Sequence, residues 1–476
     1  MSEKNVHFQD IMEREKGLQR GLTTRQLTMI AIGGAIGTGL FLGSGMAIGF
    51  AGPGVIVSYL IGAVIALLLM GCLAEMTVAH PTTGSFGAHA ERYINPWAGF
   101  TVRYSYWFSL VCAVGTEVSA MSVYMKYWFP AVPGVVWILI FSAVLIYVNA
   151  TSVNLFGTVE YWFSMIKVTA IILFIVLGAF VVFGSSSHPE MGIQNLTANG
   201  GFFPNGFWGM WIAIFISLFS YLSIEMIAVS AGEAKEPEKA VPIALKSAVV
   251  RLVLFYILTL ALMLMIVPWN ETGSDRSPFV KVFELIHIPG AAGIMNFVVL
   301  TAALSAMNSQ LYISTRMVFS LSRGGFAPKK LGELSKKGVP VKALALSTIG
   351  IAIATIVGMV VPDSSFAVMI SLSSFGAMFA WFMVFVTHLF FRRKWEQMGG
   401  RKLPVRMIGY PYLSVLGAVL LASVVLSTWF QPEFKDTLRI GFPWLILITI
   451  CYFIWKKANP TAFQQPTDPI DKEISS

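Results

Sequence analysis

The strongest candidate for binding chemistry is a glycine-rich stretch at residues 33–41, with the sequence GGAIGTGLF. It lies within an apolar segment, 26–48, that is long enough to cross a bilayer. Each glycine costs a helix about 1 kcal/mol relative to alanine, so we expect the helix to break here. Backbone freed in hydrocarbon must be buried in protein or line a wet cavity, where its amides can bind a small anion such as a carboxylate.

The same glycines also fit close helix packing, because Gly33 with Gly37 and Gly39 with Gly43 form small-xxx-small pairs. Packing needs only one glycine face, so the density of glycines favours binding. The predicted contacts with a bound anion are the amides near Ile36, Gly37, Thr38 and Gly39.

A second polar interruption, residues 219–225 with the sequence FSYLSIE, lies in the apolar segment 206–231. It places Glu225 deep in the membrane, where a charge costs about 2.5–3.5 kcal/mol even on the lenient insertion scale. We therefore expect Glu225 to be functional, in proton coupling; a structural pairing with a nearby Tyr or Ser is the alternative. Phe219 and Tyr221 are candidates for an aromatic gate over a ligand, and they equally fit core packing.

Two further charged residues fall inside apolar segments. Lys167 lies in 159–184, too far from Glu160 and from the membrane interface to reach water easily. A buried lysine can take up and release a proton, and it can also occupy the place of a metal cation; a permanent ion pair is the alternative. Glu117 is a candidate partner for Lys167 or a residue of the substrate path. Lys167, Glu225 and Glu117 are thus the predicted proton-coupling residues.

The composition is that of a membrane protein. The chain has 476 residues, of which 56% are hydrophobic and 12% charged, with a mean hydropathy of +0.72. Soluble domains carry about 25% charged residues, so we expect an all-α polytopic membrane protein. The sequence has no nucleotide-binding, zinc-ligand or nucleophile motif, and its six histidines lack metal spacing. These features predict secondary transport, no enzyme activity, and no cofactor or metal.

Apolar length predicts about twelve membrane-spanning segments. Basic residues gather on one side of the membrane, whereas the other side carries about five. Since Lys and Arg concentrate on the cytoplasmic side, both termini are predicted to be cytoplasmic. This asymmetry accounts for the net charge of +9 without a nucleic-acid partner. The predicted segments are 26–48, 53–76, 98–126, 134–152, 159–184, 206–231, 247–268, 290–320, 341–361, 364–391, 408–430 and 438–455.

The spans suggest a division into an N-terminal tail (1–25), a ten-helix core (26–391), two further helices (392–455) and a C-terminal tail (456–476). The core can divide into two halves of five spans, in which the first and sixth correspond. Both have a polar, interrupted centre, and such segments at matching positions indicate a transporter binding site. On the outer side, residues 279–286 are predicted to form a short surface helix.

A set of motifs extends over essentially all the predicted spans. These are GGAIGTGLFLG at 33–43, AGPG at 51–54, EM at 75–76, PTTGSF at 81–86, the stretch 157–167, GEA at 232–234 through Pro242, LTAALS at 300–305, NS at 308–309, STRM at 314–317 and the stretch 324–328. Together they resemble the bacterial amino acid transporter family of the amino acid–polyamine–organocation superfamily. The resemblance implies a LeuT-like fold of two inverted five-helix repeats, with the first and sixth helices broken. It also implies the family's function, which is proton-coupled amino acid transport across the plasma membrane.

The resemblance also implies roles for individual residues. Backbone near Ala35, Thr38 and Gly39 would hold the substrate carboxylate. Lys167 matches a lysine that takes the place of a sodium ion in sodium-coupled relatives, which favours proton coupling. Relatives usually have glycine where this chain has Leu222 and Ser223, so we expect a stiffer break and a narrower pocket. The sixth-span residues implied to contact the substrate are Phe219, Ser220, Leu222 and Ser223.

The leading hypothesis is proton symport of a neutral, apolar or small polar L-amino acid into the cell. Exchange or export by the same fold is an alternative, and so is a permease for a cationic amino acid or 4-aminobutyrate, which Glu117 and Glu225 would serve. A transporter-like nutrient sensor is a further class. The expected partners are the amino acid, a proton and the lipid bilayer, and the sequence predicts no particular oligomeric state. The apolar pocket is predicted to contain Phe219, Leu222, Val114 and Phe375.

Overall fold

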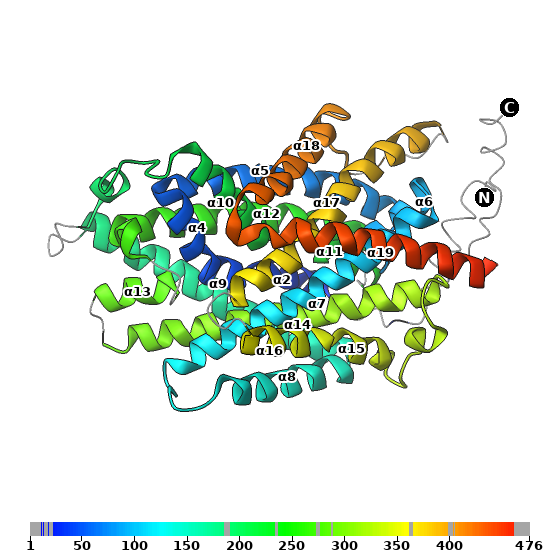
Figure 1. Ribbon diagram of the computed structural model, residues 1–476, viewed down its shortest axis with the longest axis horizontal. Coiled ribbons are helices and arrows are strands. Elements are labelled where there is room, and N and C mark those ends of the chain that lie inside the picture. The colour runs from blue at the N-terminus through cyan, green and yellow to red at the C-terminus, as the bar shows by residue number, and fades with distance from the viewer. Residues whose placement is uncertain are drawn as a thin grey trace.

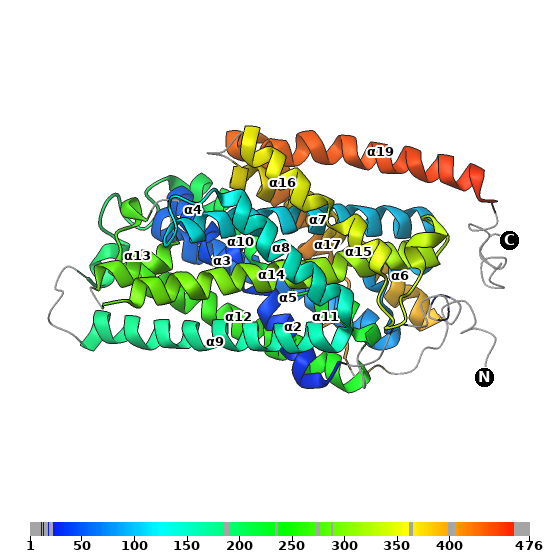
Figure 2. The same cartoon turned by 90° about the horizontal axis from the view of Figure 1, so that it is seen from below.

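The chain forms a bundle of helices that run mostly along its longest dimension (Figure 1). Helix α19 lies along one outer edge, and α9 lies along the opposite one (Figure 2). The predicted tails, 1–25 and 456–476, fall largely outside the described residues. The computed structural model describes residues 22–184, 191–233, 237–272, 277–286, 289–360, 365–397 and 405–460, and also 11, 13, 18 and 403.

Throughout these described ranges the regular structure is helical, without a β-strand, which confirms the all-α prediction there. The helices in chain order are α2 (Thr24–Ala35), α3 (Thr38–Phe41), α4 (Gly43–Ala51), α5 (Val55–Ala79), α6 (Ser85–Tyr93), α7 (Pro96–Lys126), α8 (Gly134–Thr151), α9 (Val153–Gly184), α10 (Gly206–Tyr221), α11 (Met226–Ser230), α12 (Pro237–Ile266), α13 (Pro278–Leu285), α14 (Ala291–Arg323), α15 (Val341–Ser347), α16 (Ile349–Val360), α17 (Ser365–Gln397), α18 (Tyr412–Ser427) and α19 (Asp436–Ala458).

Among the described residues, nine helical stretches are long and apolar enough to cross a membrane. Two shorter apolar helices, Leu252–Ile266 and Val341–Val357, fall in the predicted seventh and ninth spans. Every predicted span coincides with at least one helix, as expected for a multi-pass membrane protein. The ninth span, predicted as one element, contains a turn at Thr348 that separates α15 from α16.

The first and sixth spans are both interrupted, as predicted. Helix α2 ends at Ala35 and α3 begins at Thr38, with Gly37 between them in an extended conformation (φ −128°, ψ −156°). Helix α10 ends at Tyr221 and α11 begins at Met226. Both helices therefore end their backbone hydrogen-bond ladders inside the protein, where the groups left over need other partners.

Helix α7 is largely buried and packs along α14 and α17. It approaches α17 so closely that a Cβ on Gly376 would lie 2.1 Å from Ser105 O. Helix α4 meets α10 in the same way, since a Cβ on Gly209 would lie 2.2 Å from Phe50 O. Small residues allow such backbone contacts between membrane helices. α7 therefore forms a tightly fixed wall beside the broken helices.

The short helix predicted at 279–286 is present as α13, but it is not a surface helix. Phe279 is fully buried. Its ring centroid lies 4.8 Å from that of Phe41 and 4.7 Å from that of Phe174. The prediction was wrong about burial because the apolar face of α13 packs against the first span and α9, which are distant in sequence.

Replacing Gly376 by alanine should destabilise the fold, because the added methyl group overlaps Ser105 O. We expect a loss of about 1–3 kcal/mol in the free energy of unfolding, measured as a lower thermal unfolding temperature in detergent micelles. Gly49→Ala is the matched control, because a Cβ at this helical position has no atom within 4 Å. Equal unfolding temperatures for the two variants would contradict the close packing of α7 and α17.

Candidate functional site

Lys167 of α9 reaches the first break directly. Its Nζ donates hydrogen bonds to Gly33 O, to Ile36 O at 3.0 Å and to Ser305 Oγ of α14 at 2.7 Å. The side chain is fully buried. Carbonyl groups at the end of a helix lack intrahelical donors, so the ammonium group supplies what the interruption removes.

A buried carboxylate balances the charge of Lys167. Glu160 accepts hydrogen bonds from Ser305 Oγ and from Asn308 Nδ2, the latter at 3.1 Å. Asn308 Oδ1 in turn accepts from Asn149 Nδ2 of α8 at 2.8 Å. The sequence suggested that Glu160 is remote from Lys167 and close to the interface, but the structure buries it completely. Residues seven apart share a helix face, and this spacing is the signal that could have paired them through Ser305.

Tyr256 of α12 connects the two breaks. Its Oη lies 2.7 Å from Ala35 O, at the end of α2, and 2.8 Å from Ser220 O, near the end of α10. A hydroxyl group has one proton, so the two carbonyls share a single donor. Tyr59 of α5 adds a 2.8 Å hydrogen bond between its Oη and Ser220 Oγ. Neither tyrosine is among the predicted site residues, because each contact joins positions far apart in the chain.

A narrow cavity of about 20 Å³ lies between the two breaks. It has room for one water molecule but not for a larger solute, so a solute can bind only if the walls move apart. The wall combines backbone of both breaks, apolar side chains and two carboxylates. The lining residues are Gly34, Ala35, Gly37, Gly39, Tyr106, Ser109, Leu110, Ala113, Glu117, Phe219, Ser220, Leu222, Ser223, Glu225, Gln310 and Ala377.

The two carboxylates lie beside different breaks. A Cβ on Gly37 would lie 3.2 Å from Glu117 Oε1, which also accepts a 3.4 Å hydrogen bond from Gln310 Nε2. Glu225, inside the second break, accepts a 2.6 Å hydrogen bond from Tyr106 Oη. Both carboxylates are buried. An anion brought into this cavity therefore meets strong repulsion unless a carboxyl group is protonated.

Some predicted residues do not line the cavity. Ile36 contributes its carbonyl to Lys167, and Thr38 is buried outside the cavity wall. The predicted pocket residues Val114 and Phe375 also lie elsewhere; the ring of Phe375 packs where a Cβ on Gly441 would lie.

The two predicted gate residues differ in position. Phe219 lines the cavity, but Tyr221 does not. The ring centroid of Tyr221 lies 4.9 Å from that of Tyr256 and 6.2 Å from that of Tyr59. Its Oη donates a hydrogen bond to Tyr59 O at 3.2 Å. Tyr221 therefore stabilises the second break from the side that faces α5 and α12. It points away from the cavity because successive residues of α10 point in different directions.

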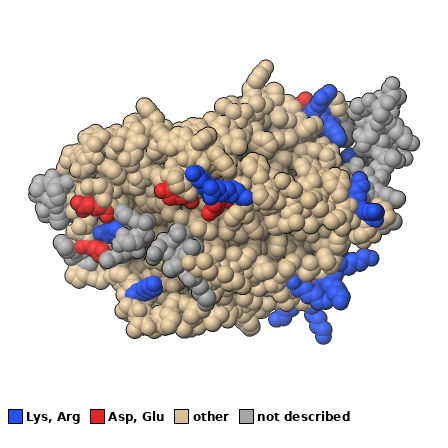
Figure 3. Space-filling view, in the orientation of Figure 1, with Lys and Arg blue, Asp and Glu red and all other residues tan. Residues whose placement is uncertain are grey.

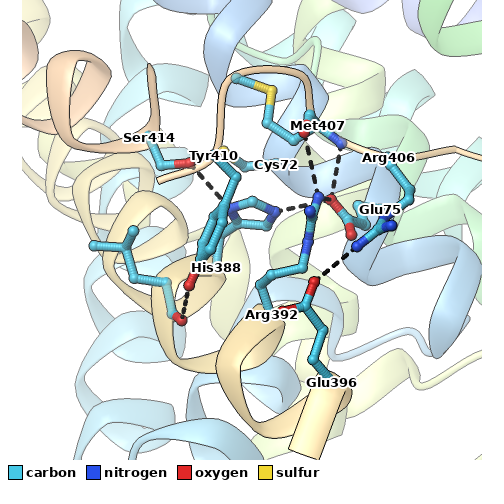
Figure 4. Close-up of polar contacts among 10 residues, drawn as sticks. Cys72, Glu75, His388, Arg392, Glu396, Arg406, Met407, Tyr410 and Ser414 are labelled. Atoms are coloured by element: carbon cyan, nitrogen blue, oxygen red, sulfur yellow. Dashed lines mark hydrogen bonds and ion pairs between the residues drawn. The ribbon is translucent and has the colours of Figure 1, made fainter. Parts of the chain in front are cut away.

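A second buried polar cluster joins α5 to α17 and to the loop before α18 (Figure 4). Glu75 Oε2 accepts hydrogen bonds from His388 Nε2 at 3.0 Å and from Met407 N at 2.8 Å. It also forms an ion pair with Arg392. His388 Nδ1 lies 3.0 Å from Ser414 Oγ on the opposite side of its ring. Removing one member of a buried ionic cluster is strongly destabilising, so these contacts hold the three elements together.

Comparison with known proteins assigns the chain to a family. Residues 26–464 match the family model described as amino acid permease. The chain belongs to the amino acid permease family. The matched range contains both interrupted spans, Lys167 and the carboxylates of the cavity. Multi-pass membrane insertion and a transport role follow for this permease, in agreement with the resemblance seen in its motifs.

Relatives of the permease differ in the substrates that their names give. It is 38% identical to the gamma-aminobutyric acid permease of Bacillus subtilis (strain 168) over 463 residues, which cover 95% of this chain and 99% of the relative. It is 36% identical to the aromatic amino acid transport protein AroP of Salmonella typhi over 452 residues, 95% of this chain and 99% of the relative. The amino-acid permease RocC of Bacillus subtilis (strain 168) is 40% identical over 443 residues, 91% and 93% of the two chains.

Replacing Ser223 by glycine should stabilise the second break. Ser223 has φ +80°, in the left-handed region where a side chain is strained and glycine is not. We expect the free energy of unfolding to rise by about 0.5–1 kcal/mol, measured by thermal unfolding in detergent micelles.

Ser230→Gly is the matched control for Ser223→Gly. Ser230 lies in helix α11, where glycine is less favourable than serine, so the free energy of unfolding should fall by about 0.5 kcal/mol. An unfolding temperature of Ser223→Gly below that of the unmodified permease would show that Ser223 does not hold a strained conformation.

Proposed function

We propose that this permease takes up a neutral, apolar or small polar L-amino acid together with a proton. The observation that carries the proposal is that both broken helices line one narrow cavity. A broken helix offers amide groups to a carboxylate and carbonyl groups to an ammonium group. Every α-amino acid has both of these charged groups, whatever its side chain.

The substrate carboxylate would bind near Gly37 and Gly39, where α3 begins. The ammonium group would bind at Ala35 O and Ser220 O, the two carbonyls that share the Tyr256 hydroxyl in the narrow state. The negative charge of Glu225 favours an ammonium group on that side. Ile36 and Thr38, which do not line the cavity, would act through the backbone of the first break. Leu222 and Ser223 do line the cavity and would contact the substrate from the second break.

Glu117 supplies the physical reason for proton coupling. It lies 3.2 Å from the Cβ position of Gly37, beside the place proposed for the substrate carboxylate. Two ionised carboxylates next to each other in a buried site repel strongly, so substrate binding favours protonation of Glu117. The proton and the substrate then cross the membrane together.

Lys167 is proposed to keep the first break in its binding geometry. Its ammonium group contacts Gly33 O and Ile36 O, and its hydrogen bond to Ser305 Oγ links it to Glu160. A fixed positive charge here would bind the freed carbonyls of the first break, the role that the family resemblance implies for a sodium ion in sodium-coupled relatives. Loss of its proton would remove the charge and one of its three N–H donors, which would weaken its hold on the carbonyls and allow the break to move.

A second candidate substrate class is 4-aminobutyrate or a cationic amino acid. Glu117 and Glu225 both line the cavity, and an ammonium group remote from the substrate carboxylate would neutralise one of them. The 38% identity to a gamma-aminobutyric acid permease supports this candidate. Exchange or export on the same site remains the alternative to proton symport.

We further propose twelve spans, with ten forming two inverted five-helix repeats, in the plasma membrane with both termini in the cytoplasm. Charge supports this orientation, because blue side chains gather at the end of the molecule where α19 ends (Figure 3). Lys456 and Lys457 lie in the last turn of α19. Lys and Arg concentrate on the cytoplasmic side of membrane proteins.

Uptake by proteoliposomes tests the proposed function. With an inward proton gradient and no sodium, the purified permease should accumulate a radiolabelled neutral amino acid several-fold over vesicles without a gradient. A panel containing 4-aminobutyrate, arginine and aromatic amino acids would identify the substrate class. Accumulation of 4-aminobutyrate or arginine alone would replace the leading substrate class by the second, and exchange without gradient-driven accumulation would contradict symport.

Glu117→Gln should separate proton coupling from binding. The amide is neutral, so the substrate carboxylate binds without a proton, and gradient-driven accumulation should fall at least tenfold while counterflow exchange continues. Glu271→Gln, at an exposed carboxylate in the turn Trp269–Glu271, is the matched control and should leave both activities unchanged. Full gradient-driven accumulation by Glu117→Gln would rule out this residue as the proton carrier.

A further inference from the structure

An open apolar groove of about 540 Å³ lies on the outer surface of the bundle, away from the substrate cavity. It runs between α8 and α16, which lie side by side (Figure 1). Leu139 of α8 and Ile356 of α16 stand at one end and are 62% and 61% exposed. Ile146 and Thr348 stand at the other end.

The groove exists because α8 and α16 each pack more closely against α7 than against one another. A Cβ on Gly350 would lie 1.8 Å from Val111 O of α7, and one on Gly134 would lie 1.9 Å from Ser122 Oγ of α7. Between them, Ala143 and Ala352 are too small to fill the space. The wall is mostly apolar and is formed by two of the predicted membrane spans, so we expect the groove to face hydrocarbon.

The polar atoms at the groove do not make it a site for a water-soluble ligand. Thr355 Oγ1 donates to Ile351 O at 2.8 Å, and Thr348 Oγ1 donates to Ala345 O at 2.7 Å, so both hydroxyl groups are satisfied within their own chain segment. Ser142 is buried, at 5% exposure. The groove therefore fits a flexible hydrocarbon chain.

Basic side chains lie at the end of the groove marked by Thr348. Helix α15 begins at Val341, and the exposed Lys342 follows it by one residue. Lys336 and Lys337 are exposed in the preceding turn, and within the described part of the chain neither forms an ion pair, whereas Lys342 is paired with Glu333. Figure 3 shows blue side chains gathered at the lower right, where Figure 1 places the start of α15.

We propose that this groove and the lysines form a binding site for one anionic phospholipid. An acyl chain lies in the groove, and the phosphate group lies against Lys336 and Lys337, beside the Lys342–Glu333 ion pair. Lys342 precedes Thr348 by six residues, or about 9 Å along a helix, which separates a headgroup site from an acyl-chain site as in a phospholipid. Basic pockets between membrane helices bind anionic headgroups in this way.

Charge also disfavours a second copy of this chain as the occupant. Two copies related by a two-fold axis along the membrane normal would pair the same surface with itself. The lysines of both copies would then meet at the same end of the contact, where like charges repel. A lipid phosphate neutralises these charges instead.

Native mass spectrometry of the purified permease in detergent tests the proposal. The probes are phosphatidylglycerol and phosphatidylcholine with identical acyl chains. We expect the permease to retain phosphatidylglycerol at least fivefold more than phosphatidylcholine. Lys336→Ala with Lys337→Ala should reduce this preference to less than twofold, because the contact is with the headgroup charge.

Lys456→Ala with Lys457→Ala is the matched control, since it removes two exposed lysines at the end of α19. Ala352→Trp should fill the groove and abolish retention of both lipids, whereas Val419→Trp, at a 55% exposed position of α18, should not. Equal loss of preference in both lysine variants, unchanged retention by Ala352→Trp, or a lipid-free dimer would each contradict the proposal.

Discussion

The structure depends on one constraint: backbone groups released by a broken helix inside the membrane must find partners within the protein. At the first break, Lys167 Nζ donates hydrogen bonds to Gly33 O and Ile36 O. Tyr256 Oη lies within hydrogen-bond distance of one carbonyl from each break. These contacts allow an interrupted helix to be stable inside the membrane. They come from α9 and α12, which are continuous helices at these residues.

The same contacts explain why a binding site and a coupling mechanism can share one place. A break that is held only by side chains can change its geometry when a proton or a substrate alters those side chains. Glu117 lies beside the first break and Glu225 within the second, so the charge of the cavity depends on protonation. Close packing elsewhere limits motion to the breaks. Helix α7 contacts α17 closely at Gly376, and the buried Glu75 cluster links α5 to α17.

Local sequence features predicted the elements well, because a dense run of glycines and a buried charge are costly wherever they occur. The interruption at residues 36–37, the interruption after Tyr221 and the burial of Lys167 all followed from such costs. The family resemblance, rather than a local feature, marks Leu222 and Ser223 as departures from glycine, and the left-handed φ of Ser223 shows the strain that this departure brings.

Partners across the bundle could not be predicted in the same way. Glu160 pairs with Lys167 only through Ser305 of another helix, and Tyr256 meets carbonyls of two distant segments. Tyr221 resembles a gate residue in sequence, yet its direction depends on how α10 is rotated against α5. Such contacts follow from helix rotation and depth, which a single sequence leaves open.

Hydrogen exchange tests whether Lys167 holds the first break in place. The amides of residues 33–41 are compared between the permease and Lys167→Met in detergent, with Lys126→Met, an exposed lysine at the end of α7, as control. We expect at least tenfold faster exchange of these amides in Lys167→Met, with the amides of α7 and α14 unchanged, and no effect in the control. Unchanged exchange at residues 33–41 in a folded Lys167→Met permease would contradict it.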